Sequence, residues 1–133
     1  MFFLQIRYLS FFFGIISILS FFNIIYSYYL NLYLNLDTYY LSLIVSLTIS
    51  ILFYKLKVPE KKPNIYSKIL TIFSGYMLIP LILSIPFYFS IYNLTFINSY
   101  FEAISGFTST GFTIFGNIKN IDQSLILWRS STQ

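Results

Sequence analysis

A short polar stretch, residues 98–115, holds the side chains whose types and spacing best fit a chemical role. Ser99 and Glu102 have the spacing of a capping box, in which a hydroxyl and a later carboxylate each satisfy a free backbone N–H at a helix start. A helix of about two turns over residues 100–105 is predicted, with Gly106 ending it. The capping role of Glu102 is favoured over a role in attracting cations.

Small hydroxyl residues around one glycine follow this predicted helix. Residues 108–113 read Thr-Ser-Thr-Gly-Phe-Thr, which favours an extended backbone whose carbonyls point into a narrow space. Gly111 can adopt backbone angles that are closed to other residues. A short helix that enters a membrane and returns as an extended strand is a pore loop, which is tolerated only inside protein or along a watery cavity. The stretch therefore indicates ion conduction through backbone carbonyls.

The composition is that of a membrane protein. Of the 133 residues, 57% are hydrophobic and 9% are charged, whereas soluble domains carry about 25% charged residues. The chain has no cysteine and no histidine, which excludes thiol catalysis and the usual soft metal sites. It also lacks paired carboxylates at helical spacing and a phosphate-binding glycine loop. We therefore expect an all-α membrane protein that is not an enzyme and holds no cofactor.

Three apolar segments predict membrane-spanning helices, at residues 8–30, 39–54 and 69–92. At about 1.5 Å per residue the first reaches ~34 Å, enough for a hydrocarbon core of ~30 Å. An uncleaved helix is favoured over a signal peptide, because the apolar run is long and no Ala-x-Ala site follows. Pro80 and Pro86 predict bends in the third segment. The start of a fourth spanning helix follows the pore loop.

Polar residues inside these segments indicate helix packing. Asn23 is interpreted as a buried, hydrogen-bonded contact between helices rather than a functional ligand. Ser42, Ser46 and Ser50 recur every four residues and so share one helix face. Such small residues let helices approach closely, and this interpretation is favoured over a polar conduction path.

The basic residues set the predicted topology. Residues 55–68 contain five of the eight lysines and arginines, and the positive-inside rule places this short loop in the cytoplasm. The net charge of +4 therefore reports topology rather than nucleic-acid binding. An anionic-lipid site is an alternative role for the loop, but topology alone explains its charges. The N-terminus is then cytoplasmic, while residues 31–38 and 93–122 face outside. The predicted units are an N-terminal helix pair (1–56), a basic cytoplasmic loop (57–68) and a truncated helix–pore loop–helix repeat (69–133).

This topology gives the pore loop an electrostatic role. Its short helix starts outside and points its C-terminus toward the membrane interior. That end carries about half a negative charge, which favours a cation in the cavity beyond it.

Residues 100–113 resemble the first pore loop of the Trk/Ktr-type potassium transporters, a superfamily that includes the plant HKT proteins. Residues 127–133 are similar to the start of the helix that follows that loop, and the two helices before the pore unit resemble the Trk branch. The resemblance implies four linked helix–loop–helix repeats around one pore, each with a filter glycine. It implies uptake of potassium, and a bacterial inner membrane as the location.

The resemblance also implies which residues bind the ion. Gly111 would be the filter glycine of the first repeat. Ser109, Thr110, Gly111 and Phe112 would offer carbonyls to potassium, with the ion at Ser109 and Thr110 and with Thr108 and Thr113 as flanks. The implied partners are the lipid bilayer, the remaining three repeats of the same chain, a second copy in a homodimer and a cytoplasmic nucleotide-binding regulatory subunit.

Two features depart from the pattern. The sequence stops at Gln133, where the second helix of the repeat should be starting, so the other three repeats are not in it. Thr113 also stands where potassium channels with Thr-Val-Gly-Tyr-Gly have a second glycine, a simplification that the transporter family shares. Two other functions therefore stay open. One is a subunit of a small tetrameric cation channel, and the other is a non-transport accessory membrane protein whose loop packs between helices.

Overall fold

The computed structural model describes residues 6–56, 64–116 and 120–133. These residues form helices and no strand, which confirms the predicted all-α class. The helices are α1 (Ile6–Tyr29), α2 (Leu36–Lys55), α3 (Ile65–Leu83), α4 (Ile85–Tyr88), α5 (Phe96–Phe107) and α6 (Gln123–Ser131). Three stretches, Arg7–Tyr29, Leu36–Lys55 and Ile65–Tyr88, are long and apolar enough to cross a membrane. The chain is an integral membrane protein.

The ends of the helices differ from the predicted ends where local chemistry decides them. After α1, Asn31 has φ 56°, and the N–H groups of Asn31 and Leu32 donate back to Tyr28 (3.3 Å) and Ser27 (2.8 Å). This is a Schellman ending, which asparagine tolerates because it adopts left-handed angles readily. The third segment breaks after α3 rather than continuing to residue 92, because Pro86 has no N–H to donate and is placed in the first turn of the separate helix α4.

Helices α1 and α2 form an antiparallel pair joined by serines that are buried or half-buried. The Ser10 hydroxyl donates to the Ser50 carbonyl (2.8 Å), and the Ser50 hydroxyl donates to the Ser10 carbonyl (2.9 Å). The Ser20 hydroxyl donates to that of Ser42 (3.1 Å), and Ser46 is fully buried. The interpretation of the serine stripe as a packing face is confirmed.

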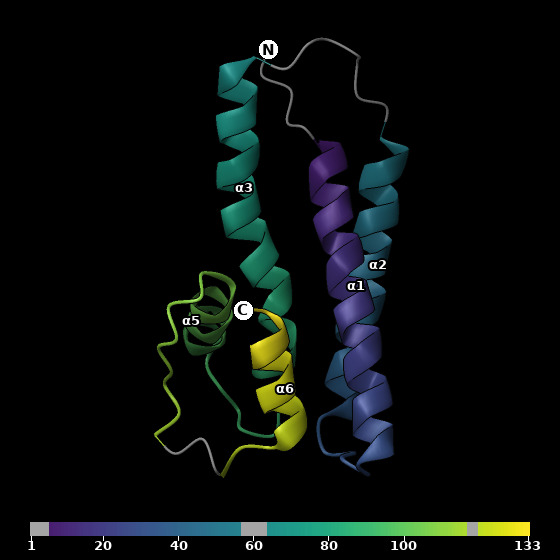
Figure 1. Ribbon diagram of the computed structural model, residues 1–133, viewed down its shortest axis with the longest axis vertical. Coiled ribbons are helices and arrows are strands. Elements are labelled where there is room, and N and C mark those ends of the chain that lie inside the picture. Colours follow the sequence, from purple (N-terminus) through teal and green to yellow (C-terminus); the bar gives the residue numbers. More distant parts are fainter. Residues whose placement is uncertain (1–5, 57–63, 117–119) are drawn as a thin grey trace.

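The remaining helices lie along one side of this pair. Figure 1 shows α3 separating from α1 and α2 toward one end of the molecule. At the other end, α6 lies between the α1–α2 pair and the short α5. Trp128 of α6 is fully buried, and its indole N–H donates to the Leu83 carbonyl at the end of α3 (3.1 Å). The core between α3, α6 and the α1–α2 pair is centred on this tryptophan.

The basic loop falls largely outside the described residues. Residues 57–63 are not described, whereas Lys55 ends α2 and Lys68 lies in the first turns of α3. The predicted cytoplasmic position of this loop, its lipid-binding role and the boundaries between the three predicted units stay predictions.

Candidate ion-conduction site

Helix α5 begins earlier than the sequence pattern predicted. It starts at Phe96, and the side chain of Thr95 caps it by accepting the Asn98 N–H (3.3 Å). Ser99 therefore lies inside the helix, where its hydroxyl donates to the Thr95 carbonyl (3.0 Å). The predicted capping box of Ser99 and Glu102 is wrong, because Thr95 supplies the same chemistry one turn before.

The end of α5 is a Schellman ending built on a serine. The Thr110 N–H donates to the Ser105 carbonyl (3.1 Å), and the Ser109 N–H donates to the Gly106 carbonyl (2.9 Å). Ser109 has φ 55°, an angle that usually calls for glycine. Gly106 does not end the helix as predicted. A Cβ added to it would lie 2.5 Å from the Thr132 hydroxyl, so Gly106 allows the close approach of α5 and α6.

The chain then continues without regular structure through Gly111, whose φ is 78°. The backbone thus takes left-handed angles at Ser109 and again at Gly111, with Thr110 between them. Within the described part of the chain, the carbonyls of Thr108, Ser109 and Thr110 accept no hydrogen bond from protein. We call residues 108–112 the carbonyl segment.

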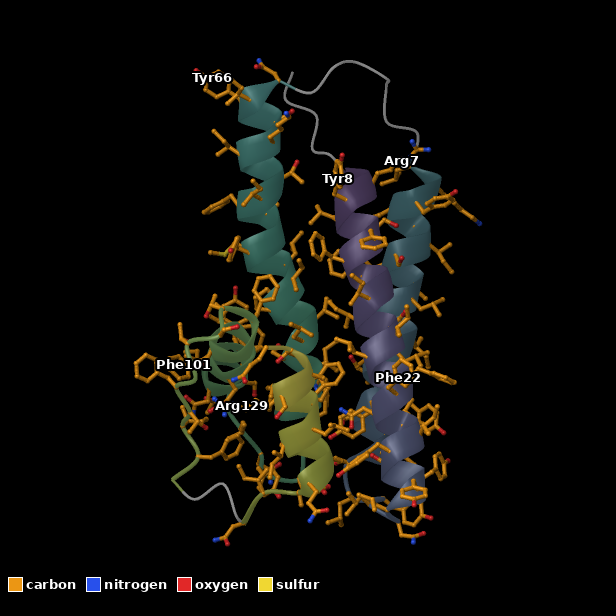
Figure 2. All side chains as sticks on the ribbon, viewed as in Figure 1. Arg7, Tyr8, Phe22, Tyr66, Phe101 and Arg129 are labelled. Carbon is orange, nitrogen blue, oxygen red and sulfur yellow. The ribbon has the colours of Figure 1, made fainter. Side chains whose placement is uncertain are left out.

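A buried ion pair fixes the far end of this segment. Glu102 is fully buried, and one of its carboxylate oxygens lies 3.0 Å from Nε of Arg129 on α6. The other oxygen accepts the Thr113 hydroxyl (2.7 Å) and the Ile114 N–H (2.6 Å). Figure 2 shows Arg129 on the side of α6 that is turned toward α5. A buried carboxylate is tolerated when it has a charged partner and hydrogen-bond donors, and Glu102 has both.

Arg129 also holds the carbonyl segment directly. Its Nη2 donates to the Phe112 carbonyl (2.7 Å) and, more weakly, to the Gly111 carbonyl (3.3 Å). The Phe112 carbonyl accepts the Ser105 hydroxyl as well (2.5 Å). A carbonyl has two lone pairs, so both are taken at Phe112. Its predicted role as an ion ligand does not fit this structure.

The predicted site residues are therefore brought together, but in different roles. Thr108, Ser109 and Thr110 carry the carbonyls that accept no hydrogen bond within the described residues, the Gly111 carbonyl accepts from Arg129, and the Thr113 hydroxyl donates to Glu102. Whether an ion binds there stays a prediction. No group of three carboxylate, imidazole or thiol side chains that could hold a metal occurs among the described residues.

Arg129 is the residue that sequence reasoning missed. The charge of Arg129 could have indicated this role. It is a cation in residues 127–133, which follow the loop, and Glu102 is the acidic residue of the predicted pore helix. Charges in apolar surroundings are usually paired.

Comparison with known proteins gives one informative match. No family model and no solved structure matches this chain. A protein described as an uncharacterized cation transporter, from Methanocaldococcus jannaschii, is 29% identical over 122 residues. The match covers 90% of this chain and 26% of that protein, so the chain spans about a quarter of the length of this relative. The chain is thus similar to part of a described cation transporter.

Proposed function

We propose that this chain is the N-terminal part of a Trk-type potassium transporter, and that its carbonyl segment is the first of the four pore loops through which cations cross the membrane. The observation that carries the proposal is the run of carbonyls at Thr108, Ser109 and Thr110, which accept no hydrogen bond within the described residues. The backbone has left-handed angles at Ser109, within this run, and at Gly111, just after it. The description of the relative as a cation transporter supports the same class of activity.

The proposed mechanism uses backbone oxygen alone. Carbonyls that lack a protein donor are available to replace the water around a cation as it is dehydrated. Helix α5 ends at this segment, and its C-terminus contributes about half a negative charge, which favours a cation nearby. Ser109 and Thr110 are the proposed potassium ligands, and Gly111 sets the direction of the chain beyond them. The proposed preference of the pore for potassium over sodium rests on the resemblance of residues 100–113 to the first pore loop of the Trk/Ktr-type transporters.

A single loop surrounds an ion on one side only, so the proposed pore needs three further loops. We expect a transporter that contains residues 1–133 to restore growth of an uptake-deficient bacterial strain at limiting potassium. Vesicles reconstituted with the 133-residue chain alone should show no potassium flux, because irregular backbone needs protein partners around a central axis. Flux from the chain alone would favour the tetrameric channel, and failure of the complete protein to support growth or flux would reject transport.

We also propose that the N-terminus and residues 57–63 are cytoplasmic and that the carbonyl segment enters from outside. The chain has no cysteine, so single cysteines report topology cleanly. Leu34 between α1 and α2 is 69% exposed. An impermeant thiol reagent applied to intact cells should label Leu34→Cys and leave Lys61→Cys unlabelled. The reverse pattern of labelling would invert the proposed orientation.

A further inference from the structure

We propose that the helix pair α1–α2 positions the carbonyl segment through α6, with Tyr39 and Asn35 as positioning residues for ion selectivity. The inference rests on the proposed function and assigns a role to two helices that do not themselves contain the carbonyl segment. It follows from a set of buried polar contacts between the pair and the N-terminal half of α6.

Asn35 joins three segments that are far apart in the sequence. It precedes α2 and is 1% exposed. Its amide nitrogen donates to a carboxylate oxygen of Asp122 (2.9 Å), and its amide oxygen accepts the Ile91 N–H (3.2 Å). The connection between α1 and α2 therefore touches both the chain that leaves α4 and the residue that precedes α6.

Asp122 passes this contact to α6, because it is the N-cap of that helix. Its carboxylate accepts the backbone N–H of Ser124 (3.2 Å) and the hydroxyl of the same serine (3.1 Å). The Tyr39 hydroxyl of α2 donates to this serine oxygen (2.9 Å), and the Tyr39 side chain is fully buried. Tyr39 of α2 thus holds the first turn of α6 directly, and Asn35, in the connection before α2, holds it through the N-cap Asp122.

A third side chain holds the next turn. Asn23 of α1 is 2% exposed. In the orientation that satisfies both of its polar atoms, its amide donates to the Ser124 carbonyl and accepts the Trp128 N–H, each at 3.2 Å. This confirms the interpretation of Asn23 as a helix contact. Trp128 directly precedes Arg129, whose guanidinium donates to the Gly111 and Phe112 carbonyls of the carbonyl segment.

A continuous series of contacts therefore runs from α2 to the carbonyl segment: Tyr39 and Asn35 to the start of α6, then along that helix to Arg129, then to Gly111 and Phe112. Buried hydrogen bonds in apolar surroundings favour one arrangement strongly, because an unpaired polar group there is costly. Since a helix is stiff over two turns, a shift at its first turn moves Arg129 too.

Two adjacent tyrosines give a matched test in the transporter that contains this chain. Tyr39→Phe removes the hydroxyl that binds α6, whereas Tyr40→Phe removes one that pairs with Tyr28 of α1 (3.0 Å) and is exposed. We expect Tyr39→Phe to lower the potassium-over-sodium flux ratio by about two- to tenfold, the range that loss of one hydrogen bond allows. Tyr40→Phe should leave the ratio unchanged.

A second variant keeps the test decisive if Tyr39→Phe does not fold. Ser124→Ala removes the acceptor of the same bond and should lower the ratio similarly, and the double variant should add little to either change. A lower unfolding temperature with an unchanged flux ratio would overturn the inference, because a purely structural contact would behave that way. Gly111→Ala separates the two proposals. If it lowers the ratio while Tyr39→Phe matches Tyr40→Phe, only this inference fails; if it leaves the ratio unchanged, the proposed function fails.

Discussion

Gly111→Ala is expected to lower the potassium-over-sodium flux ratio of the complete transporter by about tenfold while the protein still inserts. Gly111 has φ 78°, and a Cβ built on it would meet no atom within 4 Å. Alanine would therefore fit the space but not the backbone angle. Holding an L-residue at that angle costs about 1–2 kcal/mol, and relaxing the angle would turn the neighbouring carbonyls away from the ion. Either response weakens the proposed coordination.

Gly116→Ala is the matched control in the same loop. A Cβ on Gly116 also meets no atom within 4 Å, and its φ lies outside the left-handed region. Alanine there adds the same methyl group without the backbone strain, so the flux ratio should stay near that of the wild type. The measurement is the ratio of potassium to sodium flux in vesicles, with membrane insertion checked in parallel. Equal ratios for the two variants would show that Gly111 is not a filter residue.

The sequence predicted the features that depend on apolar length and spacing. The spans, the serine stripe of α2 and the buried Asn23 each follow from a repeat or a composition that favours one environment over its alternatives. The position of a glycine-centred segment after a short helix was predicted for the same reason. Each of these predictions used only the residue type and its position in or after an apolar segment, and did not need the identity of the partner.

The roles within the site depend on partners that are distant in the sequence. Ser99 and Glu102 match a capping box, but Thr95 already caps α5, and the carboxylate binds Arg129 across 27 residues instead. Because Arg129 is held beside Glu102, its guanidinium donates to the Phe112 carbonyl, and this carbonyl is then not available to an ion. The sequence favoured Gly106 as the residue that ends α5, but Ser109 has the left-handed backbone angle after the helix. Gly106 instead lies where α5 contacts the end of α6, and a Cβ there would meet the Thr132 hydroxyl.

Removal of one partner of the Glu102–Arg129 pair should be the most destabilising change at the site. Arg129→Met leaves a fully buried carboxylate with two hydrogen-bond donors but no cation. Breaking a buried pair in this way costs about 3–5 kcal/mol. The same change releases the Gly111 and Phe112 carbonyls, so the flux ratio should fall together with the unfolding midpoint in detergent.

The paired variant distinguishes charge balance from geometry. Glu102→Gln keeps an acceptor for Thr113 and Ile114 while it removes the charge, so Glu102→Gln/Arg129→Met should be more stable than Arg129→Met alone. Its flux ratio should stay low, because the methionine cannot hold the carbonyls. Arg129→Lys should recover part of the stability but little of the ratio, since an ammonium cannot contact the carboxylate and both carbonyls in the fork geometry of arginine. Arg7→Met, at an exposed arginine of α1, controls for loss of a positive charge. A double variant with wild-type selectivity would mean that Arg129 only balances charge, and that the carbonyl segment is held by its own backbone.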